Sequence, residues 1–330
     1  MTENSWNETE VRLQQLFNRA ASSRADAIAL VSEDRRISFF ELQLYVEWMV
    51  GYFQSINLQP GQRVALLMAN SPKLVISLFG LWHAGGVAVP LEVTSDEATL
   101  HSQLALAGVS VIVTAPEYQS KLERALAKTG EEGATRSPFT IAIFEEDNIV
   151  TLNAKLRNRR SPATADKSDR PLFAASDAAA DHIAAIYFAA DLESRMITHE
   201  ELARAAAAMV ARMELSAHDG LICLAPLAQE NNLSGGLLAA IVAGSTLIIA
   251  ETNDWDKLEE RFADESATVA VGPAALLLRL AKSNAAKLAT LRWYFYTDVA
   301  LSPEIGERLP RRAGLRIEPL TDAIANAVRK

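Results

Sequence analysis

Short runs of β-branched and apolar residues alternate with longer stretches of helical periodicity along most of the chain. The alternation predicts β–α units around largely parallel sheets, because strands covered by helices on both faces are apolar throughout. Residues 63–68 form such a strand, residues 71–84 a helix that opens with Ser-Pro, and residues 87–89 the next strand. Gly85 and Gly86 end the helix between them. This segment therefore predicts a complete crossover unit.

The periodicity fails between residues 152 and 181, which are charged and poor in apolar side chains. Such a segment is typical of a flexible linker, and the aspartates among its basic residues favour a linker over a basic patch. We therefore expect an α/β fold of two stacked, mostly parallel-sheet lobes. The first lobe covers residues 1–151, the flexible linker residues 152–181 and the second lobe residues 182–330.

The remaining expected elements continue the same alternation. In the first lobe, a helix at 96–107 and strands at 109–114 and 141–144 are expected. In the second lobe, the expected strands are 183–188, 221–224, 246–250, 268–271 and 291–296. The expected helices there are one from Thr198, whose spacing to Glu201 predicts a capping box, then 233–243, 255–262, 274–281, one from Ser302 and a last one at 323–330.

The net charge and the cysteine content indicate which kinds of partner and which cellular compartment to expect. With 32 Lys and Arg against 41 Asp and Glu, the net charge is −9, which argues against nucleic acid as a partner. Cys223 is the single cysteine and stands in an apolar run, so we expect a buried thiol and a reducing compartment. The polar, acidic first residues lack the features of a signal peptide and favour the cytoplasm. The most apolar stretch, 237–250, is too short to span a membrane, which takes about 18 residues.

Several common site motifs are absent from the sequence. Neither the dinucleotide fingerprint Gly-x-Gly-x-x-Gly nor the P-loop Gly-x-x-x-x-Gly-Lys-Ser/Thr occurs, and Gly-x-Ser-x-Gly is missing too. The five histidines have no zinc-binding spacing. The acidic triplet at 145–147 is more typical of a solvated turn than of a cation site.

Residues 38–42, 58–72 and 81–91 resemble the N-terminal lobe of adenylate-forming enzymes, the superfamily of acyl-CoA synthetases, nonribosomal-peptide adenylation domains and luciferases. Pro273 with the residues after it, and 291–304, resemble the second lobe of the same enzymes. The resemblance implies a chemistry in which ATP and a carboxylic acid give an acyl-adenylate, and a thiol then takes the acyl group. It reaches from about residue 10 to residue 322, without a counterpart of the family's C-terminal domain and its catalytic lysine.

The phosphate-binding loop of this family corresponds to residues 189–197, which contain neither glycine nor lysine. Without glycine, backbone N–H groups are not readily exposed to phosphates, and Asp191 and Glu193 would repel them. Arg195 is the one cation of this segment. We therefore expect a structural turn here and doubt that ATP and magnesium bind.

The substrate pocket of the family corresponds to the segment after the strand 221–224. There Gln229 takes the place of the family's pocket histidine, and Glu230, Asn231 and Asn232 follow where relatives line the acyl or amino-acid pocket. A polar pocket for a small acid is one interpretation. Capping of the next helix by Asn232 or Ser234 is the other.

Two further motifs of the family survive only as remnants. Thr297 and Asp298 stand in the adenine-contacting turn, where relatives carry small residues. Thr321 and Asp322 correspond to phosphate and magnesium contacts, which makes Asp322 the candidate metal ligand; capping of the last helix explains both residues as well.

These observations predict an adenylation-domain-like protein that is not catalytic by itself, and that binds a small acid, an acyl group or a protein partner such as a carrier protein or synthetase. The alternative is a partial acyl-CoA synthetase that acts with another chain or on preactivated acyl thioesters. Fold alone does not separate these functions.

Overall fold

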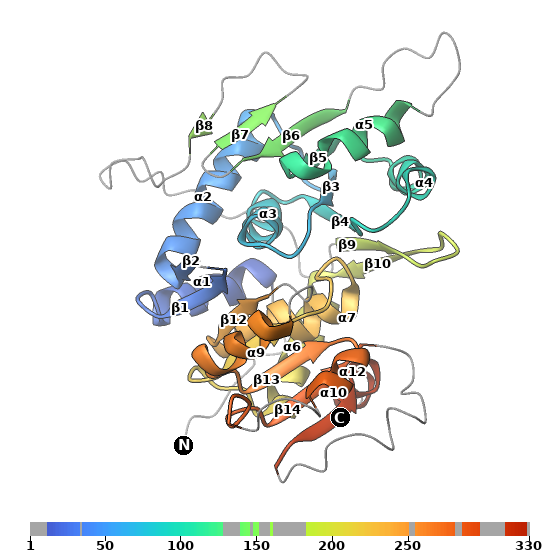
Figure 1. The fold of residues 1–330 in the computed structure, drawn as a ribbon. Helices are drawn as coiled ribbons and strands as arrows, with labels where there is room; N and C mark the ends of the chain where they lie inside the picture. Colours follow the sequence, from blue (N-terminus) through green and yellow to red (C-terminus); the bar gives the residue numbers. More distant parts are fainter. Residues whose placement is uncertain are drawn as a thin grey trace.

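Two β-sheets lie one above the other, with helices between them and on their outer faces (Figure 1). The computed structural model describes residues 12–33, 35–127, 139–145, 148–151, 159–160, 183–250, 255–280, 286–297 and 314–328.

The first sheet combines eight strands of the described residues, in the order β10-β9-β4-β3-β5-β6-β7-β8. The strands from β9 to β6 in this order are parallel, and β10, β7 and β8 are added antiparallel. Their bounds are β3 Arg63–Leu67, β4 Val87–Leu91, β5 Val111–Thr114, β6 Thr140–Phe144, β7 Asn148–Thr151, β8 Arg159–Arg160, β9 Ile183–Phe188 and β10 Ser194–Thr198.

The second sheet combines seven described strands, in the order β15-β14-β13-β11-β12-β1-β2. All neighbours are parallel except β1 and β2, which form an antiparallel pair at one edge. Their bounds are β1 Ile28–Ser32, β2 Arg35–Ser38, β11 Gly220–Cys223, β12 Thr246–Ile249, β13 Val269–Gly272, β14 Trp293–Tyr296 and β15 Arg316–Pro319.

The two sheets do not follow the lobe boundaries that we expected from the sequence. β1 and β2 come from residues 1–151 but extend the sheet of the C-terminal half, because Leu30 pairs with Leu247 in a parallel ladder. Conversely, β9 and β10 come from residues 182–330 but belong to the first sheet, because Ala185 of β9 pairs with Ala88 of β4 and β10 pairs with β9. The chain therefore crosses between the sheets twice. The expected linker, 152–181, lies outside the described residues except for 159–160.

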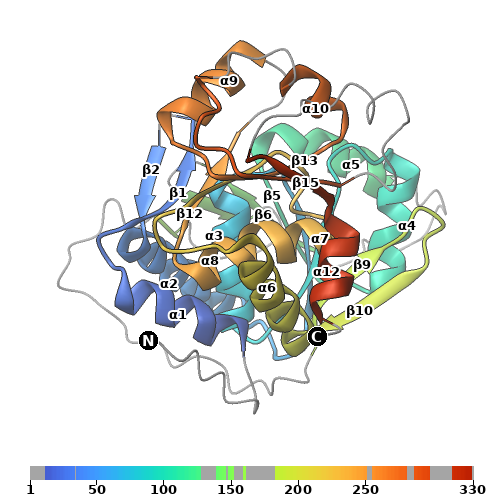
Figure 2. The same ribbon diagram turned by 90° about the horizontal axis from the view of Figure 1, so that it is seen from below.

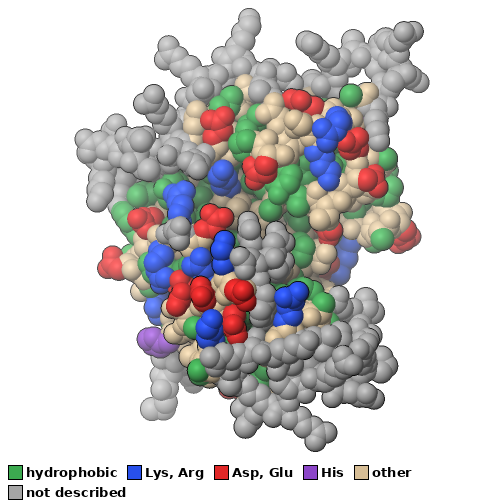
Figure 3. All heavy atoms as spheres, in the orientation of Figure 1, with side chains coloured by type: hydrophobic (Ala, Val, Ile, Leu, Met, Phe, Trp, Pro, Cys, Tyr) green, Lys and Arg blue, Asp and Glu red, His purple; other side chains and the backbone are tan. Residues whose placement is uncertain are grey.

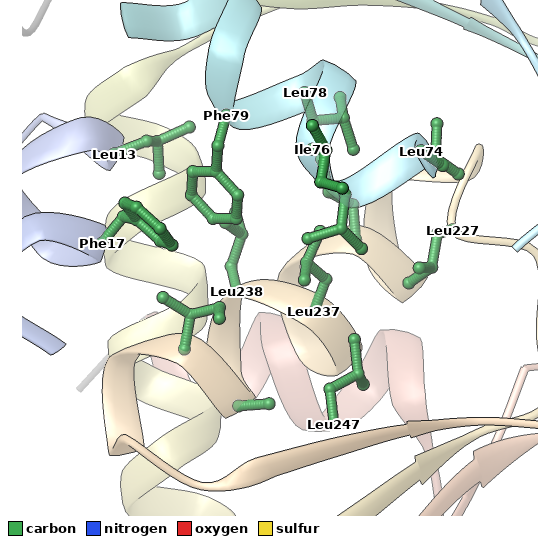
Figure 4. Close-up of a cluster of buried hydrophobic side chains, with 14 of the residues drawn as sticks. Leu13, Phe17, Leu74, Ile76, Leu78, Phe79, Leu227, Leu237, Leu238 and Leu247 are labelled. Atoms are coloured by element: carbon green, nitrogen blue, oxygen red, sulfur yellow. The ribbon is translucent and has the colours of Figure 1, made fainter. Parts of the chain in front are cut away.

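Apolar side chains from helices of both halves fill the space between the sheets. Phe79 and Leu78 of α3 face Leu237 and Leu238, and Phe17 of α1 stacks on Phe79 with ring centroids 4.7 Å apart (Figure 4). The helices are α1 Leu13–Ser23, α2 Phe39–Ser55, α3 Pro72–His83, α4 Glu97–Ala107, η1 Pro116–Tyr118, α5 Gln119–Ala127, α6 His199–Met213, α7 Glu230–Asn232, η3 Leu233–Leu238, α8 Ala239–Ala243, α9 Trp255–Asp264, α10 Ala275–Leu280 and α12 Leu320–Val328. One core thus joins both halves of the chain.

Helix starts follow the local sequence signals closely. Ser71 caps α3 by accepting a hydrogen bond from the Leu74 N–H, with Pro72 in the first turn as expected. Thr198 and Glu201 form the expected capping box of α6. Both signals act over three residues, so the rest of the fold hardly affects them.

Four expected elements differ from the structure or fall outside it. Residues 194–197, expected in a turn, belong to β10, because they pair with β9 in an antiparallel hairpin. The helix expected at 233 already begins at Glu230, and the last helix begins at Leu320 rather than at 323. The helix expected from Ser302 lies outside the described residues. None of the helices that the structure describes is both long and apolar enough to cross a membrane.

Candidate functional site

Polar side chains gather where the carboxyl ends of both sheets come together. Asn70 follows β3 and clamps the segment after β11: its Nδ2 donates to the Ala225 carbonyl at 2.8 Å, and its Oδ1 accepts from the Leu227 N–H at 2.8 Å. Ligand sites of open parallel sheets lie at this end of the strands. The clamp fixes residues 226–232 against the first sheet.

Gln229 connects the two sheets directly. Its Nε2 donates to Glu92 Oε1 at 2.6 Å, and Glu92 directly follows β4. Asn232 is 1% exposed and donates to Gln229 Oε1 and to the Pro226 carbonyl, both at 3.0 Å. Two of the expected pocket residues, Gln229 and Asn232, therefore form one hydrogen-bonded polar strip with Glu92, which holds Gln229 in a single orientation.

Asn232 and Ser234 do not cap a helix, so the capping interpretation is wrong. The Asn232 side chain donates to Gln229 and Pro226, which precede it in the chain. The Ser234 hydroxyl donates to the Glu230 carbonyl at 3.0 Å within the helix. Asn231 instead donates from Nδ2 to Thr321 Oγ1 at 3.3 Å. Thr321 and Asp322 lie in the first turn of α12, after its start at Leu320, and so do not cap it either.

A π-helical turn, η3, follows the polar strip. A Cβ added to Gly235 would lie 2.7 Å from Leu320 Cδ1, so the absence of a side chain lets α12 approach closely. A Cβ on Gly236 would lie 3.1 Å from Cys223 Sγ. Figure 2 shows α12 beside α6. Gly235 thereby allows the position from which Thr321 meets Asn231.

The segment expected to bind phosphates is a tight hairpin that uses its own donors. The Ala189 N–H donates to the Glu193 carbonyl at 2.9 Å, and the Leu192 N–H to the Ala189 carbonyl at 3.0 Å. The Glu193 N–H donates to Asp191 Oδ1 at 3.1 Å. A phosphate cradle needs several backbone N–H groups that point outward together. Three N–H groups of this hairpin are bonded within it instead, so it fits a magnesium–triphosphate group poorly.

Arg195 pairs with carboxylates, and its side chain is 62% exposed. Its Nη1 lies 2.9 Å from Glu230 Oε1 and 3.1 Å from Glu230 Oε2, and its Nη2 lies 3.9 Å from Glu201. Burial raises the pKa of Glu230, Arg195 lowers it, and the charge of Glu201 raises it again. The structure thus places the nucleotide remnant Arg195 beside the pocket candidate Glu230.

The other described nucleotide remnants, Thr297, Thr321 and Asp322, follow the carboxyl ends of β14 and β15, which are neighbouring parallel strands. The Thr297 N–H is bonded to the Gly272 carbonyl at 3.1 Å, and Asp298 lies outside the described residues. Asp322 is exposed, and its charge adds to burial in raising the pKa of Tyr296. The described residues contain no group of three acidic, histidine or cysteine side chains that would hold a metal ion. Asp322 alone is a poor magnesium site.

Cys223 and a small pocket do not contribute a side chain to this polar strip. Cys223 is buried, and burial raises its thiol pKa to about 12, as expected of a structural cysteine. A shallow pocket of about 100 Å³ lies between α1 and α8. It shares no residue with the polar strip, and its lining is Leu16, Arg19, Ala20, Ser23, Arg24, Val242, Ala243 and Gly244.

Sequence reasoning missed Asn70, Glu92, Tyr187 and Glu201 as site residues. Asn70 and Glu92 come shortly after the correctly predicted strands β3 and β4, and polar residues at carboxyl ends of parallel strands are the signal that would have found them. Nothing in the sequence marked Tyr187 as a site residue, since aromatic residues are common in β-strands.

The comparisons with known proteins agree with this fold. The family model described as AMP-binding enzyme matches residues 17–323. Among curated relatives, 4-coumarate-CoA ligase 1 of Narcissus pseudonarcissus is 23% identical over 76% of this chain and 45% of its own length. Bacitracin synthase 2 of Bacillus licheniformis is 23% identical over 64% of this chain and 7% of its own length.

Solved structures give the same picture. The N-terminal domain of FACL13 from Mycobacterium tuberculosis matches with a TM-score of 0.77 at 16% identity, over 97% of this chain and 80% of that one. The anthranilate CoA ligase AuaEII, in complex with anthranoyl-AMP, matches with a TM-score of 0.77 at 15% identity, over 94% of this chain and 58% of that one. The chain spans about half the length of the CoA ligases that it matches.

Proposed function

The chain belongs to the AMP-binding enzyme family, and from this premise we propose that it is a member that does not adenylate acids by itself. In this proposal, its body binds a small carboxylic acid, or a partner such as a carrier protein or synthetase, in a pathway of acyl or aminoacyl activation. A CoA ligase and a bacitracin synthase among the relatives support the choice of pathway.

The observation that carries the proposal is the β9–β10 hairpin. Adenylation depends on donors and cations that face the phosphates where charge develops. In this chain the turn bonds its own N–H groups, and its single guanidinium is paired with Glu230. Asp191 and Glu193 add negative charge at the same turn.

Exchange of labelled pyrophosphate into ATP tests this proposal. The assay uses aliphatic acids, aromatic acids and amino acids in turn, with a CoA ligase of the family as positive control. We expect no acid-dependent exchange with this chain. Exchange that depends on an acid and disappears in Asp322→Ala would contradict the proposal.

A second candidate function is an enzyme that acts with another chain or on preactivated acyl thioesters. The strip of Gln229, Asn232 and Glu92 favours it, because these side chains are held in place at the carboxyl ends of the strands without any contribution from the phosphate hairpin. Acyl-CoA and acyl-carrier thioesters of graded chain length test it. Turnover that is lost in Gln229→Ala supports this function, and no turnover at any chain length rejects it.

A further inference from the structure

A buried hydroxyl without a partner lies beside the Arg195–Glu230 pair. Tyr187 on β9 is 8% exposed, and among the described residues no group forms a hydrogen bond with its phenolic oxygen. Buried hydroxyls are nearly always bonded, because removing one from water without a partner is costly. The orphan hydroxyl therefore points to a second arrangement of its neighbourhood.

Strand register places Tyr187 and Arg195 on the same face of the sheet. They are direct partners in the antiparallel β9–β10 ladder, and directly opposed residues project to one side. Their neighbours on this face, Ala185 and Ile197, belong to the core between the sheets, whereas Met196 on the other face is 54% exposed. Tyr187 and Arg195 thus both project toward the layer that contains α6 and α7.

Glu230 reaches both of these side chains electrostatically. Both of its carboxylate oxygens contact Nη1 of Arg195, and its charge adds to burial in raising the pKa of Tyr187 well above its ordinary value. The phenol is therefore protonated at neutral pH and is a hydrogen-bond donor. Glu230 is the nearby acceptor that Arg195 already occupies.

We propose that Arg195 binds the carboxylate of a small monocarboxylic acid, and that Glu230 then leaves Arg195 and accepts a hydrogen bond from the Tyr187 hydroxyl. The exchange replaces one guanidinium–carboxylate pair by another and gives the orphan hydroxyl a partner. This inference rests on the proposed function, since it names the residues that would hold the small acid.

The local charge selects a monocarboxylate over a phosphate. The hairpin and the first turn of α6 contribute four further carboxylates, namely those of Asp191, Glu193, Glu200 and Glu201. Arg195 is the one guanidinium within these two segments, and Arg204, one turn further along α6, pairs with Glu200. A ligand with several negative charges is repelled here. A monocarboxylate brings a single negative charge, which takes the place of the Glu230 charge at the guanidinium.

Calorimetric titration with benzoate, acetate and inorganic phosphate tests the proposal on the full chain and on four variants. We expect benzoate or acetate to bind and phosphate not to bind. Arg195→Gln should weaken binding at least tenfold, because the guanidinium is lost. Glu230→Gln should strengthen it at least threefold, because the competing charge is lost, and Tyr187→Phe should weaken it several-fold.

The opposite effects of Arg195→Gln and Glu230→Gln separate this proposal from a structural role. Both variants remove the same ion pair, so a merely structural pair would change binding in one direction. Arg204→Gln is the matched control, because Arg204 pairs with Glu200 one turn along α6, and we expect it to leave binding unchanged. A near-ultraviolet difference spectrum of tyrosine on adding benzoate should vanish in Tyr187→Phe.

The proposal is overturned if neither acid binds, if phosphate binds instead, if Arg195→Gln and Glu230→Gln change affinity in the same direction, or if Arg204→Gln weakens binding as much as Arg195→Gln. These outcomes are independent of pyrophosphate exchange. If pyrophosphate exchange occurs and the acids bind as expected, only the proposed function is contradicted. If no acid binds and no pyrophosphate exchange occurs, only this inference is contradicted.

Discussion

Gly80 marks the closest approach of two helices in the core. An added Cβ would lie 2.6 Å from Met49 Cβ, an atom fixed to the backbone of α2. Alanine favours helix over glycine by about 1 kcal/mol, but inserting a methyl group into a packed core costs about 1–3 kcal/mol. At Gly80 the cost of the steric contact exceeds the gain in helix propensity, because Met49 Cβ cannot move unless α2 moves with it.

We therefore expect Gly80→Ala to lower the free energy of unfolding by about 1–2 kcal/mol, since the packing cost exceeds the gain in helix propensity. Urea unfolding followed by circular dichroism measures the change. Ser102→Ala in α4 is the control and should change stability by less than about 0.5 kcal/mol. Greater stability of Gly80→Ala would show that α2 and α3 separate freely.

His83 at the end of α3 predicts a loss of stability in acid. Burial lowers the pKa of His83, although a hydrogen bond to the Phe79 carbonyl at 2.7 Å opposes the shift. The unfolded chain therefore binds a proton more readily than the folded one at this residue. The contribution of neutral, buried His83 to the free energy of unfolding is complete above the ordinary histidine pKa of about 6.5. It is lost as the pH falls from there through the lowered folded-state pKa.

Unfolding free energies at several pH values between about 7.5 and 5 test this sign. His83→Gln should reduce the fall of stability with acid, at about 1.4 kcal/mol for each unit by which folding lowers the pKa. An unchanged slope in His83→Gln would contradict the prediction.

At the level of elements, the loop after β3 and the loop after β11 are joined by Asn70. Its side chain satisfies the Ala225 carbonyl and the Leu227 N–H, two backbone groups from the other half of the chain. Leaving backbone groups unpaired in a partly buried position is costly. The polar strip depends on this clamp for its position.

Asn70→Ala should therefore destabilise the protein by about 1–3 kcal/mol and also weaken acid binding. The two readouts are urea unfolding and benzoate titration. Gln59→Ala, which removes an exposed amide bonded to the Asn57 carbonyl, should affect neither. Normal stability in Asn70→Ala would mean that water replaces the clamp.

Local elements were predictable from the sequence, whereas contacts between distant elements were not. The capping box of α6 depends on Thr198 and Glu201, three residues apart, and was predicted correctly. Gln229 and Glu92 are 137 positions apart, so no local pattern announces their bond. The Arg195–Glu230 pair likewise arises only because the hairpin returns Arg195 to the face of Tyr187.

At the scale of the molecule, the parallel fold and the family were predictable, but the division into sheets was not. Alternating patterns identify strands without naming their neighbours, so nothing in β1 indicated that it joins β12 rather than β3. Acidic and basic side chains are interspersed on the face seen in Figure 3, in keeping with the net charge of −9. At this scale we propose a family scaffold whose nucleotide site does not suit ATP.

A calorimetric titration with ATP and magnesium tests that claim most directly. We predict no saturable binding under conditions in which a CoA ligase of the family saturates, and no difference between the wild type and Asp322→Ala. Saturable one-site binding of ATP that is lost in Asp322→Ala would contradict the account.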